Sequence, residues 1–196
     1  DNQVYTFTNL MCWTALRSLE RLRARGVLEG VKEKEWRKAA ERAEAAVRAA
    51  VDGGVVRNGP GDTTLDSSIL QAASFVFPDA ALMRQTVETI ERELTLEKGF
   101  LFRYRRADDF GTPESAFMIC SFWLIQALAA IGDRERALEL MHEVMKAGNH
   151  VQLFAEHFDP ATKTQLGNFP QAYSHVGLIN AAFAVSPSWD AFLSHD

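Results

Sequence analysis

Glu156 is the residue of this chain whose neighbours best suit acid or base chemistry. It lies between apolar residues, with Phe154 and Ala155 before it and Phe158 two positions after it. If these neighbours pack inward, they remove water from around the carboxyl, and proteins tune carboxyl groups for proton transfer in this way. A glutamate in a loop is more often an exposed surface residue, so the pattern alone leaves both interpretations open. Asp159, which precedes a proline, is more typical of a structural turn.

Segment 99–106 (GFLFRYRR) combines aromatic and cationic side chains. Aromatic faces cover the apolar C–H patches of a sugar ring, and guanidinium groups donate hydrogen bonds to its hydroxyls, so the composition suits a carbohydrate site. One alternative is a surface arginine cluster neutralised by Asp108 and Asp109. A site for single-stranded nucleic acid is a weaker alternative.

The acidic charge balance limits the partners. The chain has 21 Lys and Arg against 26 Asp and Glu, a formal net charge of −5. Nucleic acids and anionic membranes bind to concentrated basic surfaces, so neither is an expected partner. A neutral or cationic small molecule, or another protein, fits better.

Cys12 and Cys120 each lie in an apolar run, without a CxxC spacing. We expect two buried free thiols, which indicates a reducing compartment, the cytoplasm. The longest apolar stretch, 116–131, is shorter than a membrane span requires.

No metal or cofactor is predicted. The run beginning at His142 resembles the zinc-binding HExxH helix at first, but Lys146 stands where the second histidine ligand must be. Gly59 and Gly61 flank a proline, but no Lys-Ser or Lys-Thr pair follows them. They are therefore expected to form a turn and not a phosphate-binding loop. His175 is as readily a satisfied core histidine as a hydrogen-bond donor to substrate.

Hydrophobic periodicity divides the helices into two kinds. Segments 34–51, 79–94 and 133–147 have one apolar face each, and the last is expected to bury Leu138, Met141 and Met145. Asp79 is a predicted N-cap. Segments 10–22 (in its first half), 65–75, 116–131 and 172–185 are apolar nearly all round and are expected to be covered on several sides. Alternation of inner and outer helices predicts an all-α fold, an (α/α) toroid.

The connections are asymmetric. Turns from inner to outer helices are short, whereas connections 52–64, 95–113 and 148–169 are long. All the long connections reach the N-terminal ends of inner helices, as does segment 1–7. Long loops in compact domains are usually functional, so the site is expected on that face.

Two nearby strings carry a family resemblance: residues 155–160 (AEHFDP) and 166–175 (LGNFPQAYSH). They resemble the corresponding segment of glycoside hydrolase family 15, the glucoamylases and their bacterial glucoamylase and trehalase-like relatives. Supporting matches spread over nearly the whole chain: Arg103-Tyr104, segments 114–117 and 120–124, Phe7-Thr8 and segment 10–13.

The resemblance implies an (α/α)6 toroid of the six-hairpin glycosidase type and an inverting, exo-acting hydrolysis of α-glucosidic bonds in an α-glucan or α-glucoside. By position, Glu156 would be the general base, Arg103 and Tyr104 would line the sugar subsites, and Glu114 is a weaker candidate. His157 stands where relatives often carry Glu or Gln. No metal or cofactor is implied.

One departure from the family concerns the general acid, a Glu in a Trp-Glu motif a few residues before the match to Phe7-Thr8. No such motif stands there, and its spacing places it just before Asp1. Residues 1–196 are therefore expected to form a single partial domain, roughly half of the toroid, that is inactive alone. The alternative function is a non-catalytic helical module that binds a carbohydrate or a protein through the same loops.

Overall fold

The computed structural model describes residues 4–28, 33–109 and 111–188, and helices make up most of them. The helices are α1 (Thr6–Ala24), α2 (Glu33–Ala49), the 3-10 helix η1 (Ser67–Leu70), α3 (Gln71–Ser74), α4 (Ala80–Leu94), α5 (Met118–Ala130), α6 (Arg134–Val144), the 3-10 helix η2 (Met145–Ala147) and α7 (Ala172–Val185). The strands are β1 (Val51–Asp52), β2 (Val55–Val56), β3 (Thr95–Glu97), β4 (Phe100–Leu101), β5 (Ala116–Phe117), β6 (His157–Asp159) and β7 (Thr164–Leu166).

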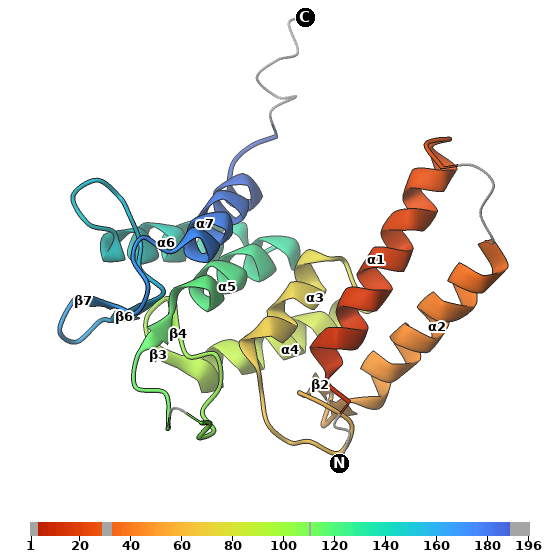
Figure 1. Cartoon of the computed structure of the whole chain (residues 1–196), viewed down its shortest axis with the longest axis horizontal. Coiled ribbons are helices and arrows are strands. Elements are labelled where there is room, and N and C mark those ends of the chain that lie inside the picture. The colour runs from red at the N-terminus through yellow and green to blue at the C-terminus, as the bar shows by residue number, and fades with distance from the viewer. Residues whose placement is uncertain (1–3, 29–32, 110, 189–196) are drawn as a thin grey trace, which may run out of the picture.

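Helix α5 is the centre of the arrangement. It packs against α6 and α7 on one side and against η1, α3 and α4 on the other, while α1 and α2 form a separate pair at the N-terminal end (Figure 1). Phe122, Leu124, Ile125 and Leu128 of α5 are completely buried. The inner helix predicted over 116–131 is therefore confirmed. It begins at Met118, because the two residues before it form β5.

The outer helix α4 has the predicted face and the predicted cap. Its apolar stripe, which includes Met83 and Ile90, is buried, and Asp79 Oδ1 accepts a hydrogen bond from the Leu82 N–H at 3.0 Å. That bond satisfies one of the backbone donors that the first turn of a helix leaves unpaired.

Helix α6 is rotated relative to the prediction. Its buried stripe is Ala137, Leu140, Met141 and Val144, which has the i, i+3, i+4, i+7 spacing of one helix face. Leu138 lies away from that face and is 42% exposed, so the expectation that it is buried was wrong.

Helix α7 packs closely on α5 through Gly177. A Cβ at this position would lie 2.5 Å from Ile119 Cδ1 and 3.1 Å from Phe122 Cβ, so the absence of a side chain permits the close approach of the two helices. The opposite face of α7 is exposed, including Val176 and Phe183. In the described residues α7 is thus covered on one side, not all round.

Helix α1 is also covered on one side. Leu10 and Trp13 are buried, and the Trp13 ring lies 5.2 Å from that of Phe77. Cys12 is exposed while Cys120 is fully buried, so the expectation of two buried thiols was wrong for Cys12. The physical reason is that Cys12 lies outside the face of α1 that packs against the core.

The long connections contain short antiparallel strands that the all-helical prediction missed. Strands β1 and β2 pair around Gly53 and Gly54, both with positive φ, and β5, β6 and β7 form a three-stranded sheet. The segment predicted as one inner helix over 65–75 is split into η1 and α3. No helix among the described residues is long and apolar enough to cross a membrane.

Candidate active site

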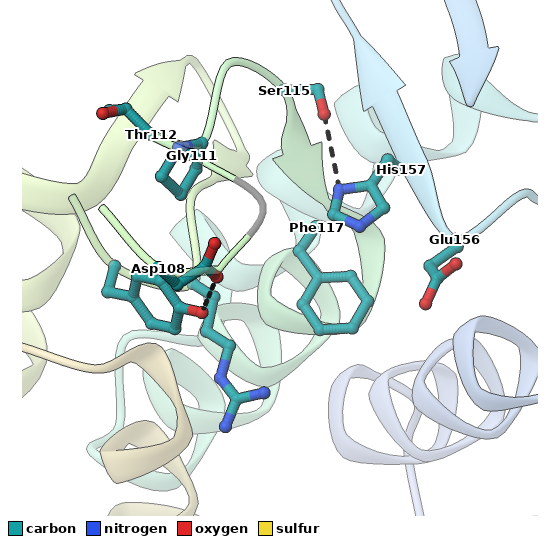
Figure 2. Close-up of a pocket in the computed structure, with 10 residues that line it drawn as sticks. Asp108, Gly111, Thr112, Ser115, Phe117, Glu156 and His157 are labelled. Atoms are coloured by element: carbon teal, nitrogen blue, oxygen red, sulfur yellow. Dashed lines mark hydrogen bonds between the residues drawn. The ribbon is translucent and has the colours of Figure 1, made fainter. Parts of the chain in front are cut away.

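A cleft of about 330 Å³ opens where connection 95–113 meets connection 148–169. Its lining comprises Arg103, Tyr104, Asp108, Gly111, Thr112, Pro113, Ser115, Phe117, Glu156 and His157. Figure 2 shows Glu156, His157 and Phe117 on one side of the cleft and Asp108 across from them. The fold thus brings Glu156 together with Arg103 and Tyr104 on the face where the long connections gather.

The neighbours of Glu156 pack inward, as the sequence suggested. Phe154, Ala155 and Phe158 are buried, and Glu156 itself is half-buried at the edge of the cleft. Its Oε2 accepts two hydrogen bonds from Asn168, one from the side-chain Nδ2 at 3.0 Å and one from the backbone N–H at 3.3 Å. Within the described chain no group is bonded to Oε1, so one carboxylate oxygen is fixed and the other is available.

The backbone of Glu156 is held on both sides. Its N–H donates to the Asn168 carbonyl at 2.9 Å, and its carbonyl accepts from the N–H of Met118, the first residue of α5, at 3.0 Å. The start of α5 and the segment before α7 therefore fix the position of the carboxyl directly.

The residues just before Glu156 are held by the first turn of α7. The Ser174 hydroxyl donates to the Ala155 carbonyl at 2.8 Å. His175 Nδ1 lies 2.7 Å from the Gln171 carbonyl, to which it must donate, so Nε2 accepts from the Phe154 N–H at 3.4 Å. Both ring nitrogens of His175 thus form hydrogen bonds within the protein. Of the two alternatives for this residue, the structure favours the satisfied core histidine over the donor to substrate.

Gln165 of β7 completes this support with one side chain. Its Oε1 accepts from the Ala155 N–H at 2.7 Å, and its Nε2 donates to the carbonyls of Ala147 and Leu153 at 2.9 and 3.1 Å. Buried backbone groups outside regular secondary structure need such partners, because an unpaired one costs about 1–3 kcal/mol. The irregular segment that carries Glu156 is therefore rigidly supported.

Arg103 lies between the cleft and a second hollow that Tyr5, Phe7 and Asp66 also line. Its Nε lies 3.5 Å from Asp66 Oδ2, whose side chain is 5% exposed. Asp66 Oδ1 meanwhile accepts from the Ser68 N–H at 2.9 Å and caps η1. The carboxylate orients the guanidinium, and the described residues leave its terminal nitrogens unbonded.

Tyr104 is held by charged side chains. Its hydroxyl donates to Asp108 Oδ2, and the guanidinium carbons of Arg103 and Arg106 lie 5.7 and 4.5 Å from its ring centroid. The hydrogen bond to Asp108, together with burial, raises the pKa of Tyr104 above its usual value. The phenol is therefore a neutral donor whose proton is already engaged.

Several other predicted residues have clear positions. Glu114 is exposed and is not among the residues that line the cleft. Asp159 accepts hydrogen bonds from the Thr162 hydroxyl and the Ala161 N–H, which is the predicted turn. Of segment 1–7, residues 1–3 lie outside the described residues.

Among the described residues, no group of three or more His, Cys, Asp or Glu side chains is placed to hold a metal ion.

Residues 6–183 match the glycosyl hydrolases family 15. The chain belongs to this family. Among curated family relatives, trehalase of Mycolicibacterium smegmatis is 38% identical over 194 residues, which cover 94% of this chain and 28% of the relative. Trehalase of Mycobacterium tuberculosis is likewise 38% identical, with the same coverage. Trehalase 1 of Sulfolobus acidocaldarius is 30% identical, over 92% of this chain and 31% of the relative. The chain thus spans less than a third of these proteins.

Solved glycosidase structures share the fold of this family 15 chain. A wild-type glycosidase superposes with a TM-score of 0.78 at 19% identity, over 93% of this chain and 52% of the glycosidase. A variant glycosidase in complex with glucose superposes equally well. The chain therefore spans about half of these structures and has the helical arrangement of part of an (α/α)6 toroid.

Several residues of this site were not predicted from the sequence. Ser115, Phe117 and Asp108 line the cleft, and Asn168 binds Glu156. Asn168 stands in the family string 166–175, but the sequence gives no sign of its contact with Glu156. The N-cap of α7 is Gln171. Ser115 and Phe117 fall in the supporting match 114–117 without a predicted role, and Asp108 was expected only to neutralise the arginine cluster.

Proposed function

We propose that the complete protein hydrolyses α-glucosidic bonds as an inverting, exo-acting glycosidase, with Glu156 as the general base. The observation that carries the proposal is the hydrogen bonding of the Glu156 carboxylate at the cleft. Asn168 holds Oε2, and Oε1 has no partner among the described residues, so it is free to accept a proton from water. Membership of glycosyl hydrolase family 15 supports this assignment.

In the proposed reaction, Glu156 takes a proton from a water molecule as the water oxygen attacks the anomeric carbon. The bond from that carbon to the glycosidic oxygen breaks, and the leaving oxygen takes a proton from a general acid. Inversion requires the two carboxyl groups to be about 6.5–9.5 Å apart, with water and substrate between them.

The general acid is proposed to be a glutamate outside residues 1–196, as the family resemblance implies. Asp108 is the other carboxylate in the cleft lining, but it accepts the hydrogen bond of Tyr104 and is held as a structural acceptor. Residues 1–196 alone are therefore expected to have no measurable turnover.

Arg103 and Tyr104 are proposed to bind the sugar. Arg103 offers the terminal nitrogens of an oriented guanidinium, and Tyr104 lines the wall beside it. Glu114 is exposed and is proposed as a contact only for the part of a substrate that extends out of the cleft.

Trehalose is the first substrate to test, because the relatives at 38% identity are named trehalases. The expected products of inversion are distinctive. Water attack at one anomeric carbon of this α,α-linked disaccharide gives one β-glucose, and the departing glucose remains α. Proton NMR of the fresh products is expected to show equal amounts of the two anomers before mutarotation.

The decisive variant is Glu156→Gln in the complete gene product, with Glu139→Gln on the exposed surface of α6 as a matched control. Loss of the base is expected to lower kcat about 10²–10⁴-fold, while the control keeps the wild-type rate. Initial release of α-glucose alone would refute inversion, and wild-type rates in Glu156→Gln would refute the base. A folded protein that binds neither trehalose nor maltose in calorimetry would favour the non-catalytic alternative.

A further inference from the structure

His157 is a feature of the cleft that the proposed chemistry does not use. It follows Glu156 in sequence and lines the same cleft (Figure 2). Its backbone is paired in the middle of the three-stranded sheet, opposite Phe117 of β5 and Leu166 of β7. The ring therefore projects from a position that the sheet fixes.

Two side chains of the β5 segment orient the imidazole. The Phe117 ring is stacked on it, with centroids 4.8 Å apart and an interplanar angle of 13°. Ser115 Oγ lies 3.4 Å from Nδ1. Because the stack holds the plane of the ring and Ser115 holds one edge, the imidazole is presented to the cleft in a defined orientation.

The protonation state of His157 suits a neutral ligand. Burial lowers the pKa of His157 below its usual value, and the Glu156 carboxylate and a backbone hydrogen bond at Ala116 only partly oppose this effect. The neighbouring strands present the uncharged Phe117 and Leu166 to it. The other charged groups of the cleft lining are Arg103 and Asp108. The ring is thus mainly neutral at pH 7. A neutral imidazole has one donor nitrogen and one acceptor nitrogen, and both can bond to hydroxyl groups.

We propose that His157 binds substrate directly, by hydrogen bonding to a hydroxyl of the sugar ring held against Glu156. This assignment rests on the proposed glycosidase function. It gives His157 a role in affinity for the sugar.

The test is a binding titration in the complete gene product carrying Glu156→Gln, in which substrate is not consumed. The dissociation constants of trehalose and maltose are measured by calorimetry at pH 7. In His157→Phe the ring that stacks on Phe117 is kept and the hydrogen-bonding nitrogens are lost. In His157→Gln a side chain that donates and accepts is kept. His142→Gln, on the exposed surface of α6, is the matched histidine control.

We expect His157→Phe to weaken binding of at least one sugar about three- to tenfold, as loss of a neutral hydrogen bond predicts. His157→Gln is expected to restore most of the affinity, which a purely structural role would not produce. Unchanged dissociation constants in folded His157→Phe would overturn the inference and leave the glycosidase proposal intact. Absence of sugar binding before any change at His157 would instead overturn the glycosidase proposal and this inference with it. If His157→Phe does not fold, an affinity loss in His157→Leu that His157→Gln restores supports the contact, and no loss refutes it.

Discussion

Asn168 holds Glu156 through both its side chain and its backbone: Nδ2 and the N–H donate to Oε2 at 3.0 and 3.3 Å, and its carbonyl accepts from the Glu156 N–H at 2.9 Å. The proposed base is thus bound to the residue that precedes the cis Phe169–Pro170 bond at the entry to α7. This relationship gives a direct test of how far orientation of the base contributes to the rate.

Asn168→Ala in the complete protein removes the side-chain bond and leaves the backbone bonds in place. We expect kcat to fall about tenfold with little change in KM, because the carboxylate loses its orientation in the step that transfers the proton. Asn168→Asp is expected to be slower still, since a second carboxylate against Oε2 repels Glu156. Steady-state kinetics on trehalose measure both, and equal kcat in all three proteins would contradict the role of Asn168.

Gly167→Ala tests the space around the same carboxylate. A Cβ at Gly167 would lie 2.9 Å from Glu156 Oε2, at a backbone φ of +77°. Gly61 is a matched control, because its φ is +74° and nothing lies within 4 Å of its would-be Cβ. Both alanine variants are expected to lose about 1–2 kcal/mol of unfolding free energy from the left-handed backbone. Only Gly167→Ala is expected to lose kcat as well. A similar kcat in the two variants would show that the carboxylate tolerates the added methyl group.

The parts of the fold that were predictable from sequence are those with a repeated local pattern. The stripe of α4 and the continuous apolar run of α5 follow directly from side-chain spacing. Cys12 and Leu138 were placed wrongly because spacing defines which residues share a face but not which neighbouring elements cover it. The strands were missed because two or three residues are too few for an alternating pattern to emerge.

The site divides in a similar way. Glu156, Arg103 and Tyr104 were predicted as site residues from residue types and family strings, and the structure brings all three to one cleft. Asn168 and Asp66 were not, because each acts through a partner distant in sequence. Such pairs depend on how the chain folds back on itself, which local spacing does not encode.

Asp66→Asn tests whether the buried carboxylate orients Arg103. Asparagine keeps an Oδ1 that can cap Ser68, so the start of η1 is preserved while the negative charge near Arg103 Nε is removed. We expect kcat/KM to fall about three- to tenfold, mainly through KM. The control is the same change in an Arg103→Gln background, where it should have little further effect. Additive losses in the double variant would mean that Asp66 acts independently of Arg103.

Gln165→Met tests the support of the segment before Glu156. The variant keeps a side chain of similar length but leaves the Ala155 N–H without its acceptor and the Ala147 carbonyl without a donor. It also removes one of the two hydrogen bonds to the Leu153 carbonyl, which still accepts from the Asn149 N–H. We expect a loss of at least about 2 kcal/mol in unfolding free energy, measured in urea. Gln126→Met, which removes one hydrogen bond to a carbonyl within α5, is the control and is expected to lose less than about 1 kcal/mol. Equal losses in the two variants would show that the three hydrogen bonds of Gln165 together stabilise the fold no more than the single hydrogen bond of Gln126 does.

His157 gives a pH dependence of folding stability that is independent of catalysis. Its pKa is lowered in the folded protein, chiefly by burial, relative to about 6.5 in the unfolded chain. Between the lowered value and 6.5 the unfolded state therefore binds more protons, so the free energy of unfolding falls as pH decreases through this window. His157→Gln removes the titrating group, and its stability relative to the wild type should increase as pH is lowered from 7 through the window. Urea unfolding of both proteins at closely spaced pH values, with the exposed His142→Gln as the reference, measures the difference. A constant difference between His157→Gln and the wild type across the whole range would mean that burial does not disfavour the charged imidazole in the folded cleft.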